Sequence, residues 1–147
     1  MREVSLAKRR SGARETAMQA LYQWMISGND LTEIETQFHA EQNMAKVDVE
    51  YFHDLLHGVP AQCSEIDALL QPYINRQDEM LDPVEQSILR IACWELSNRL
   101  DVPYQVVIKE AIHLARAFGS AQSHKFVNGV LDKLARQCRA AEVNRQQ

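Results

Sequence analysis

The chain has 147 residues, of which 46% are hydrophobic and 24% charged. This length and composition suit one globular domain with its own core, and they exclude a chain that is disordered throughout. No apolar run approaches the ~18 residues that a membrane-spanning helix needs, and the N-terminus lacks the apolar segment of a secretory signal peptide. The three cysteines, Cys63, Cys93 and Cys138, form no C-x-x-C pair. We therefore expect a cytoplasmic protein without disulfides and without contact to a membrane.

The net charge of -4 conceals a strong segregation of charge along the chain. Residues 1–14 hold five basic residues and one acidic residue, whereas residues 15–98 hold three basic and fifteen acidic residues. Residues 99–147 are basic again, with eight basic and four acidic residues. Two basic ends on an acidic body favour a local anionic ligand, for which RNA or DNA is the first candidate.

Apolar residues at helical spacing begin at Ala13 and predict a first helix that stops at Gly28. A second helix is predicted just after it. Asp30 and Glu33 have the spacing of a capping box, in which side chains satisfy backbone N–H groups at a helix start.

The next two predicted helices carry turn residues at their ends. Asp48 is a candidate cap for the third, which we expect to end at Gly58 and Pro60. Ser64 is a candidate cap for the fourth, which Pro72 should disturb because proline lacks a backbone N–H.

The second half of the chain shows three further helical segments. Asp82-Pro83-Val84-Glu85 is the clearest helix start, and the apolar residues that follow cover most of the helix circumference, as in a central helix. Asp101-Val102-Pro103 opens another helix that stops at Gly119, and Ser123 is a candidate cap for a last helix through about Arg136.

Helix signals recur and strand signals do not, so the sequence predicts an all-α protein of about seven helices. No Pro- or Gly-rich linker divides the chain, although Asn75 to Leu81 could join two helical halves. We therefore predict a single domain over residues 1–147, with a basic N-terminal arm over residues 1–14.

His53 and His57 are the strongest hint of a metal site, because two histidines at i and i+4 on a helix can share one zinc ion. The residue between them is Asp54 rather than the Glu of zinc proteases, and no downstream His or acid has a spacing that identifies a third ligand. The apolar stripe of this helix is formed by other residues, Phe52, Leu55, Leu56 and Val59, which leaves both histidines on the opposite, polar face. We therefore predict a solvated face, with no metal and no cofactor.

Catalytic motifs are absent from the sequence: there is no G-x-S-x-G, Walker A or G-x-G-x-x-G pattern. The cysteines stand among apolar neighbours, and a cysteine nucleophile needs a partner that only the fold can place. We therefore predict a binding protein and not an enzyme.

Two clusters have the chemistry of nucleic-acid binding. Lys8-Arg9-Arg10-Ser11-Gly12-Ala13-Arg14 combines cations that suit phosphates, although a solubilising tail is the alternative. Ser123-His124-Lys125-Phe126-Val127-Asn128 combines a cation, an aromatic ring and a carboxamide at a helix start, the groups that hold a single strand. For Phe126 the alternative is a core residue.

The sequence of residues 123–135, SHKFVNGVLDKLA, resembles the C-terminal signature of the NusB family. Residues 101–119 and 82–96 are similar to the penultimate and central helices of that family, and residues 13–24 and 47–52 follow its pattern too. The resemblance covers roughly residues 9–139 in order.

The resemblance implies two stacked helical halves, no catalysis, and a role in transcription antitermination on ribosomal RNA operons. It implies binding of boxA-type single-stranded RNA together with NusE, a small-subunit ribosomal protein, in the transcription elongation complex. By position, the RNA surface would include Arg10, Arg14, Lys125 and Phe126, and Tyr22 and Glu85 would face NusE.

Departures from the family pattern adjust this set. Ser11 and Gly12 interrupt the usual arginine run, so phosphate contacts would also rely on Lys8 and Arg9. Ala121-Gln122 replaces acidic residues before the last helix, which removes negative charge beside the RNA site. The expected RNA-binding residues are Lys8, Arg9, Arg10, Arg14, Gln122, His124, Lys125 and Phe126.

Two other readings stay open. A similar helical domain precedes the catalytic part of some ribosomal RNA cytosine methyltransferases, but 147 residues leave no room for a cofactor-binding domain, so the chain would be a detached accessory module. The other reading is a protein-interaction adaptor that never touches RNA.

Overall fold

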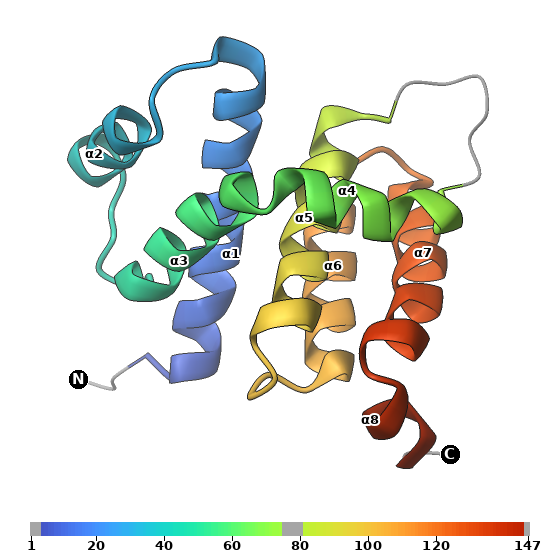
Figure 1. The fold of residues 1–147 in the computed structure, drawn as a ribbon. Helices are drawn as coiled ribbons and strands as arrows, with labels where there is room; N and C mark the ends of the chain where they lie inside the picture. The colour runs from blue at the N-terminus through green and yellow to red at the C-terminus, as the bar shows by residue number, and fades with distance from the viewer. Residues whose placement is uncertain (1–3, 75–80, 146–147) are drawn as a thin grey trace. The chain divides into compact units, whose positions relative to one another are not determined.

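The computed structural model describes residues 4–74 and 81–145, which form helices and contain no β-strand (Figure 1). The all-α prediction is thus confirmed. The elements are α1 (Leu6–Ser27), α2 (Leu31–Glu41), α3 (Val49–Ala61), α4 (Cys63–Leu70), the 3-10 turn η1 (Gln71–Tyr73), α5 (Pro83–Asn98), α6 (Tyr104–Phe118), α7 (Ser123–Cys138) and α8 (Ala140–Arg145).

The chain divides into two compact units, Met1–Ala61 and Gln62–Gln147, here called the N-terminal unit and the C-terminal unit. The sequence placed a possible junction between helical halves at Asn75 to Leu81. The structure divides the chain earlier because α4 packs on α5, where the Asp67 carboxylate receives two hydrogen bonds from Arg90 at 3.0 and 2.9 Å. Asn75 to Met80 lie outside the described residues.

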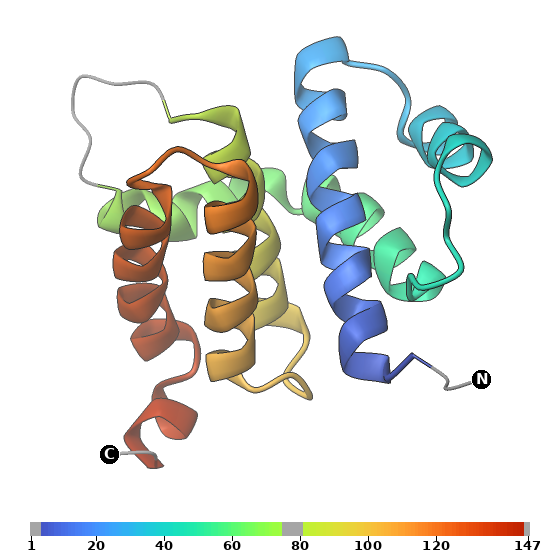
Figure 2. The same ribbon diagram turned by 180° about the vertical axis from the view of Figure 1, so that it is seen from behind.

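In the N-terminal unit α3 crosses α1 at an angle and α2 packs beside these two helices, as the reverse view shows (Figure 2). Alanines on α1 allow close approach to the large side chains of α3. Fully buried core residues of this unit include Ala13, Ala17, Ala20, Leu21, Ile34, Phe52, Leu55, Leu56 and Val59.

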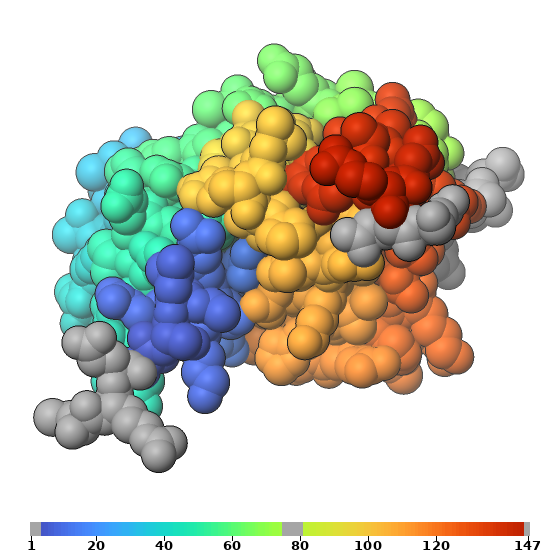
Figure 3. Space-filling view, turned by 90° about the horizontal axis from the view of Figure 1, so that it is seen from below, coloured from blue at the N-terminus to red at the C-terminus, as the bar shows by residue number. Residues whose placement is uncertain are grey.

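In the C-terminal unit α5, α6 and α7 run side by side, and α4 crosses α5 (Figures 1 and 2). Ten of the sixteen residues of α5 are buried, which confirms its prediction as a central helix. Figure 3 shows α8, in dark red, against the turn between α5 and α6, in gold. There the Glu142 carboxylate accepts a hydrogen bond of 2.8 Å from the Tyr104 backbone N–H.

Several helix ends agree with the sequence prediction. The carboxylates of Asp30 and Asp82 accept backbone N–H groups of the first turns of α2 and α5, and Asp48 does the same for α3. Gly28 ends α1 with φ of +69°, a conformation that suits glycine. A 3-10 turn follows α4 where Pro72 was expected to disturb it.

Other ends differ from the prediction. Helix α1 begins at Leu6, seven residues before Ala13, because the Ser5 hydroxyl caps it by accepting the Lys8 N–H at 3.2 Å. Helix α3 continues through Gly58 and Pro60 to Ala61. Ser64 does not cap α4, which begins one residue earlier, at Cys63.

No helix in the described part of the chain combines the length and the apolar character needed to cross a membrane.

Candidate nucleic-acid and partner surfaces

The N-terminal basic cluster lies on a helix and not on a flexible arm. Ser11 and Gly12 do not interrupt α1: the Ser11 hydroxyl donates to the Ala7 carbonyl at 3.1 Å. A Cβ on Gly12 would come within 3.1 Å of the Lys46 carbonyl oxygen, so glycine allows α1 to approach the segment before α3. The basic arm predicted over residues 1–14 is therefore part of α1 from Leu6 onward.

The four cations of this cluster differ in exposure. Lys8 and Arg9 are exposed, whereas Arg10 is half-buried and Arg14 is only 3% exposed. The guanidinium groups of Arg10 and Arg14 lie over the buried Tyr51 ring, 4.7 and 5.5 Å from its centroid. Arg10 Nε also lies 3.8 Å from the Asp48 carboxylate. Direct phosphate contact by Arg14, as expected from the sequence, is therefore blocked in this conformation.

The second cluster begins α7 in the C-terminal unit. Gln122 and Lys125 are exposed, and His124 and Phe126 are half-buried. The apolar residues at helical spacing along α7 face the core and are almost fully buried: Val127, Val130, Leu131 and Leu134. Phe126 is less buried than these four residues.

Ser123 does not cap α7; it is the first helical residue and is fully buried. Its hydroxyl donates to the Glu85 carboxylate at 2.8 Å and accepts the Ser120 backbone N–H at 3.0 Å. Gly119 leaves room for this arrangement, since a Cβ there would come within 2.6 Å of Ser123 Cβ. The start of α7 is thereby attached to the first turn of α5.

The two residues expected to face a protein partner lie in different surroundings. Tyr22 on α1 is 40% exposed, and Ile26, one turn later, is 65% exposed, so α1 carries an apolar surface spot. Glu85 is only 1% exposed. The position of Glu85 corrects the expectation that it faces a partner, because its carboxylate points inward to Ser123.

A further set of basic side chains lies on α6, and the sequence analysis assigned no role to them. Lys109, His113 and Arg116 line a pocket of about 470 Å³ together with Asp132 of α7. Their spacing of four and three residues is the signal that places them on one helix face.

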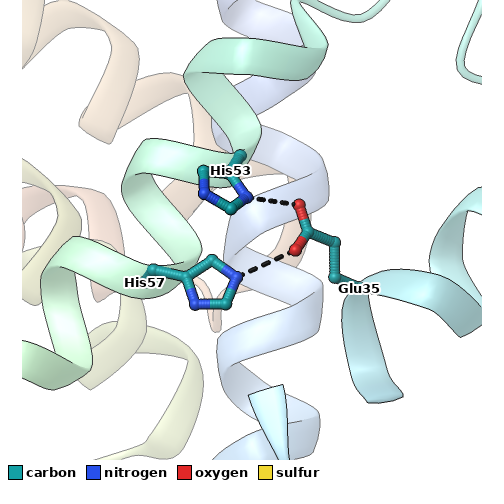
Figure 4. A group of neighbouring side chains, drawn as sticks. All are labelled: Glu35, His53 and His57. Carbon is teal, nitrogen blue, oxygen red and sulfur yellow. Dashed lines mark hydrogen bonds and ion pairs between the residues drawn. The ribbon is translucent and has the colours of Figure 1, made fainter. Parts of the chain in front are cut away.

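His53 and His57 meet an acid that the sequence analysis did not consider. Glu35 of α2 receives one hydrogen bond from each imidazole, from His53 Nδ1 to Oε2 and from His57 Nε2 to Oε1, both 2.8 Å long (Figure 4). Burial acts to raise the pKa of the Glu35 carboxyl, but the hydrogen bonds from His57 and His53 outweigh it and hold the pKa below its ordinary value. Glu35 lies upstream of both histidines and on another helix, so no spacing within the histidine helix indicates it.

Comparison with known proteins gives a consistent result. A sequence model described as the NusB family matches residues 11–136. A transcription antitermination protein NusB from Teredinibacter turnerae is 55% identical over 139 residues, which are 94% of this chain and 95% of that protein.

Two solved structures share the fold. A NusB from T. maritima has a TM-score of 0.74 and 30% identity, covering 87% of this chain and 91% of that one. A NusB solved with NusE in complex with double-stranded RNA has a TM-score of 0.70 and 27% identity, covering 88% of this chain and 97% of that one.

Proposed function

Given that this chain belongs to the NusB family, whose curated relatives are transcription antitermination proteins and not enzymes, we propose that it binds boxA-type single-stranded RNA of ribosomal RNA operons together with NusE. The observation that carries the RNA and NusE part of the proposal is the relative solved with NusE and double-stranded RNA, which has the same fold. The choice of a boxA-type single strand rests on the resemblance of the sequence to the family. The proposed setting is the transcription elongation complex, in the cytoplasm.

The exposed cations support the RNA part of this proposal. In the N-terminal unit Lys8 and Arg9 are exposed cations on the first turn of α1, and Lys125 is an exposed cation at the start of α7. Arg10 is a fourth, half-buried cation that reaches phosphate only by leaving Tyr51 and Asp48. Arg14 acts through the Tyr51 stack that shapes this end of α1.

The base-contacting groups belong to the start of α7. Phe126 supplies an aromatic face for one base, because the core stripe of α7 is complete without it. Gln122 and His124 flank Phe126 and supply polar groups. Glu85 positions this cluster through Ser123 without touching RNA.

A salt titration tests the phosphate contacts. With Lys8, Arg9 and Lys125 each on one phosphate, log K should fall against log salt with a slope of about -2, since each contact on a single strand contributes about -0.7. Affinity should drop about 20-fold from 50 to 200 mM salt. Lys125→Ala should make the slope shallower by about 0.7, whereas Lys133→Ala, at an exposed lysine two turns further along α7, is the matched control and should leave it unchanged.

Strand specificity is tested with labelled boxA RNA, a scrambled strand and a duplex of the same length, each with and without NusE. We expect the boxA single strand to bind best and NusE to increase its affinity. Preference for the duplex, or equal affinity for the scrambled strand, contradicts the proposed specificity. Binding of NusE with no RNA binding at any salt concentration favours the adaptor reading.

Phe126→Ala separates stacking from packing. Loss of a stacked base costs about 1 to 3 kcal/mol, or about 5- to 150-fold in RNA affinity. Leu134→Ala, on the buried stripe of the same helix, is the control: it should lower the melting temperature and leave the affinity of the folded protein unchanged. A large melting shift with unchanged affinity in Phe126→Ala would place Phe126 in the core.

The partner surface is tested by Tyr22→Asp, which puts a charge on the apolar spot formed with Ile26. Binding of NusE should weaken while the free protein still binds RNA. Thr36→Asp, exposed on α2, adds the same charge elsewhere on the N-terminal unit and should have no effect. Unchanged NusE affinity in Tyr22→Asp removes this face from the interface.

A further inference from the structure

Glu35, His53 and His57 form a cluster whose side chains converge from two helices (Figure 4). The two histidines stand one turn apart on α3, with ring centroids 4.4 Å apart, and Glu35 reaches them from α2. One ligand atom from each of the three residues lies within 4.8 Å of the others. Among the described residues this is a group of three donors with the chemistry of a metal site.

The donor types suit a first-row transition metal. Two imidazole nitrogens and one carboxylate oxygen form the three-ligand set of many zinc sites, in which water takes the fourth position. A tetrahedral ion about 2.0 to 2.1 Å from each ligand separates neighbouring ligand atoms by about 3.3 Å. The present N···O separations are 2.8 Å, so each imidazole has to move about half an ångström away from the carboxylate, and the three ligand atoms, which lie within 4.8 Å of one another, have to settle at this common spacing.

The surroundings allow an ion to enter. The side chains of His53 and His57 are 54% and 31% exposed, whereas Glu35 is 17% exposed and held between them. An entering ion replaces the two protons that now join the imidazoles to Glu35, because ligating nitrogens must be unprotonated on the metal side. Solvent at His53 can then complete the coordination with water.

We propose that Glu35, His53 and His57 bind one divalent transition-metal ion of the zinc class and thereby link α2 to α3. This reverses the expectation from the sequence that these histidines hold no metal. The linkage joins helices that otherwise meet through ring contacts such as that of Phe38 with Phe52, whose centroids lie 6.2 Å apart. None of the three residues belongs to the sets proposed for RNA or NusE.

The test uses the full chain without a histidine tag, stripped with a chelator and titrated with zinc chloride by calorimetry. We expect one ion per chain. Glu35→Gln and His57→Ala should each weaken binding at least tenfold, and His113→Ala, which removes an exposed histidine from the other unit, is the matched control. Because Glu35→Gln keeps the side-chain size, its circular dichroism should match that of the parent chain.

Two further measurements separate this site from adventitious binding. Cobalt should give the visible bands of a four-coordinate ion without the sulfur-to-metal charge-transfer band that cysteine ligation produces. Zinc at a hundredfold excess over its Kd should raise the melting temperature of the parent chain by about 5 to 10 °C, and not that of Glu35→Gln. Zinc binding that persists in a His53→Ala/His57→Ala chain, a thiolate band with cobalt, or no bound ion at all overturns the proposal.

Discussion

The hydrogen bond between Ser123 and Glu85 provides the sharpest test of how the fold holds the proposed RNA cluster. Ser123→Ala removes the hydroxyl that donates to the buried Glu85 carboxylate and accepts the Ser120 N–H. Alanine leaves almost no cavity, so the cost is that of the lost bonds. A hydrogen bond to a charged group contributes about 1.5 to 3 kcal/mol, which for a chain of this size corresponds to a fall in melting temperature of about 3 to 12 °C.

The assay is a double-mutant cycle measured by chemical denaturation. The chains compared are the parent, Ser123→Ala, Glu85→Gln and the double variant. The two residues are in contact, so the effects should be non-additive, with a coupling free energy of about 1 kcal/mol or more. Ser64→Ala, at an exposed serine in the first turn of α4, is the matched control and should leave stability nearly unchanged.

The same variants should report on RNA. If Ser123 positions the start of α7, the folded Ser123→Ala protein should bind boxA RNA several-fold more weakly although Lys125 and Phe126 are intact. Additive effects within about 0.3 kcal/mol would show that the pair contributes no coupling. Full stability together with full RNA affinity would refute the reasoning about both the bond and its role.

Three other predictions concern the C-terminal unit. Arg139 is buried and donates to four backbone carbonyls around the α5–α6 turn, so Arg139→Met should lower the free energy of unfolding by about 3 to 5 kcal/mol, as measured by urea denaturation. Burial acts to raise the pKa of Glu142, but hydrogen bonds from the Tyr104 N–H and from Arg139 hold this pKa below its ordinary value of 4.5. The free energy of unfolding that Glu142→Gln loses should therefore be constant above about pH 5 and shrink as the pH falls below 4.5. Unfolding curves from pH 3 to 7 check this, and a difference that grows in acid contradicts it. Burial, with the nearby Cys138 thiol, raises the pKa of Cys93 to about 12, so at pH 8 a thiol reagent should modify Cys93 only after unfolding, as peptide mapping can show.

The local features of this protein were readable from the sequence alone. The capping carboxylates of Asp30, Asp48 and Asp82 and the stop at Gly28 act within one helical turn, so neighbouring residues determine them. The apolar stripes were readable for the same reason, since a helix brings residues three and four apart to one face. The early start of α1 at Leu6 was missed although its cap, Ser5, is also local.

Tertiary structure decided what lies opposite each helix face. The identity of a charged residue does not show whether its side chain faces water or another side chain. Only the packing of the helices placed Arg14 over Tyr51 and Glu85 against Ser123. Glu35 reached the histidines in the same way, across 18 and 22 positions of chain. Helical spacing specifies which side chains share a face, but only the packing of one helix on another specifies which faces meet.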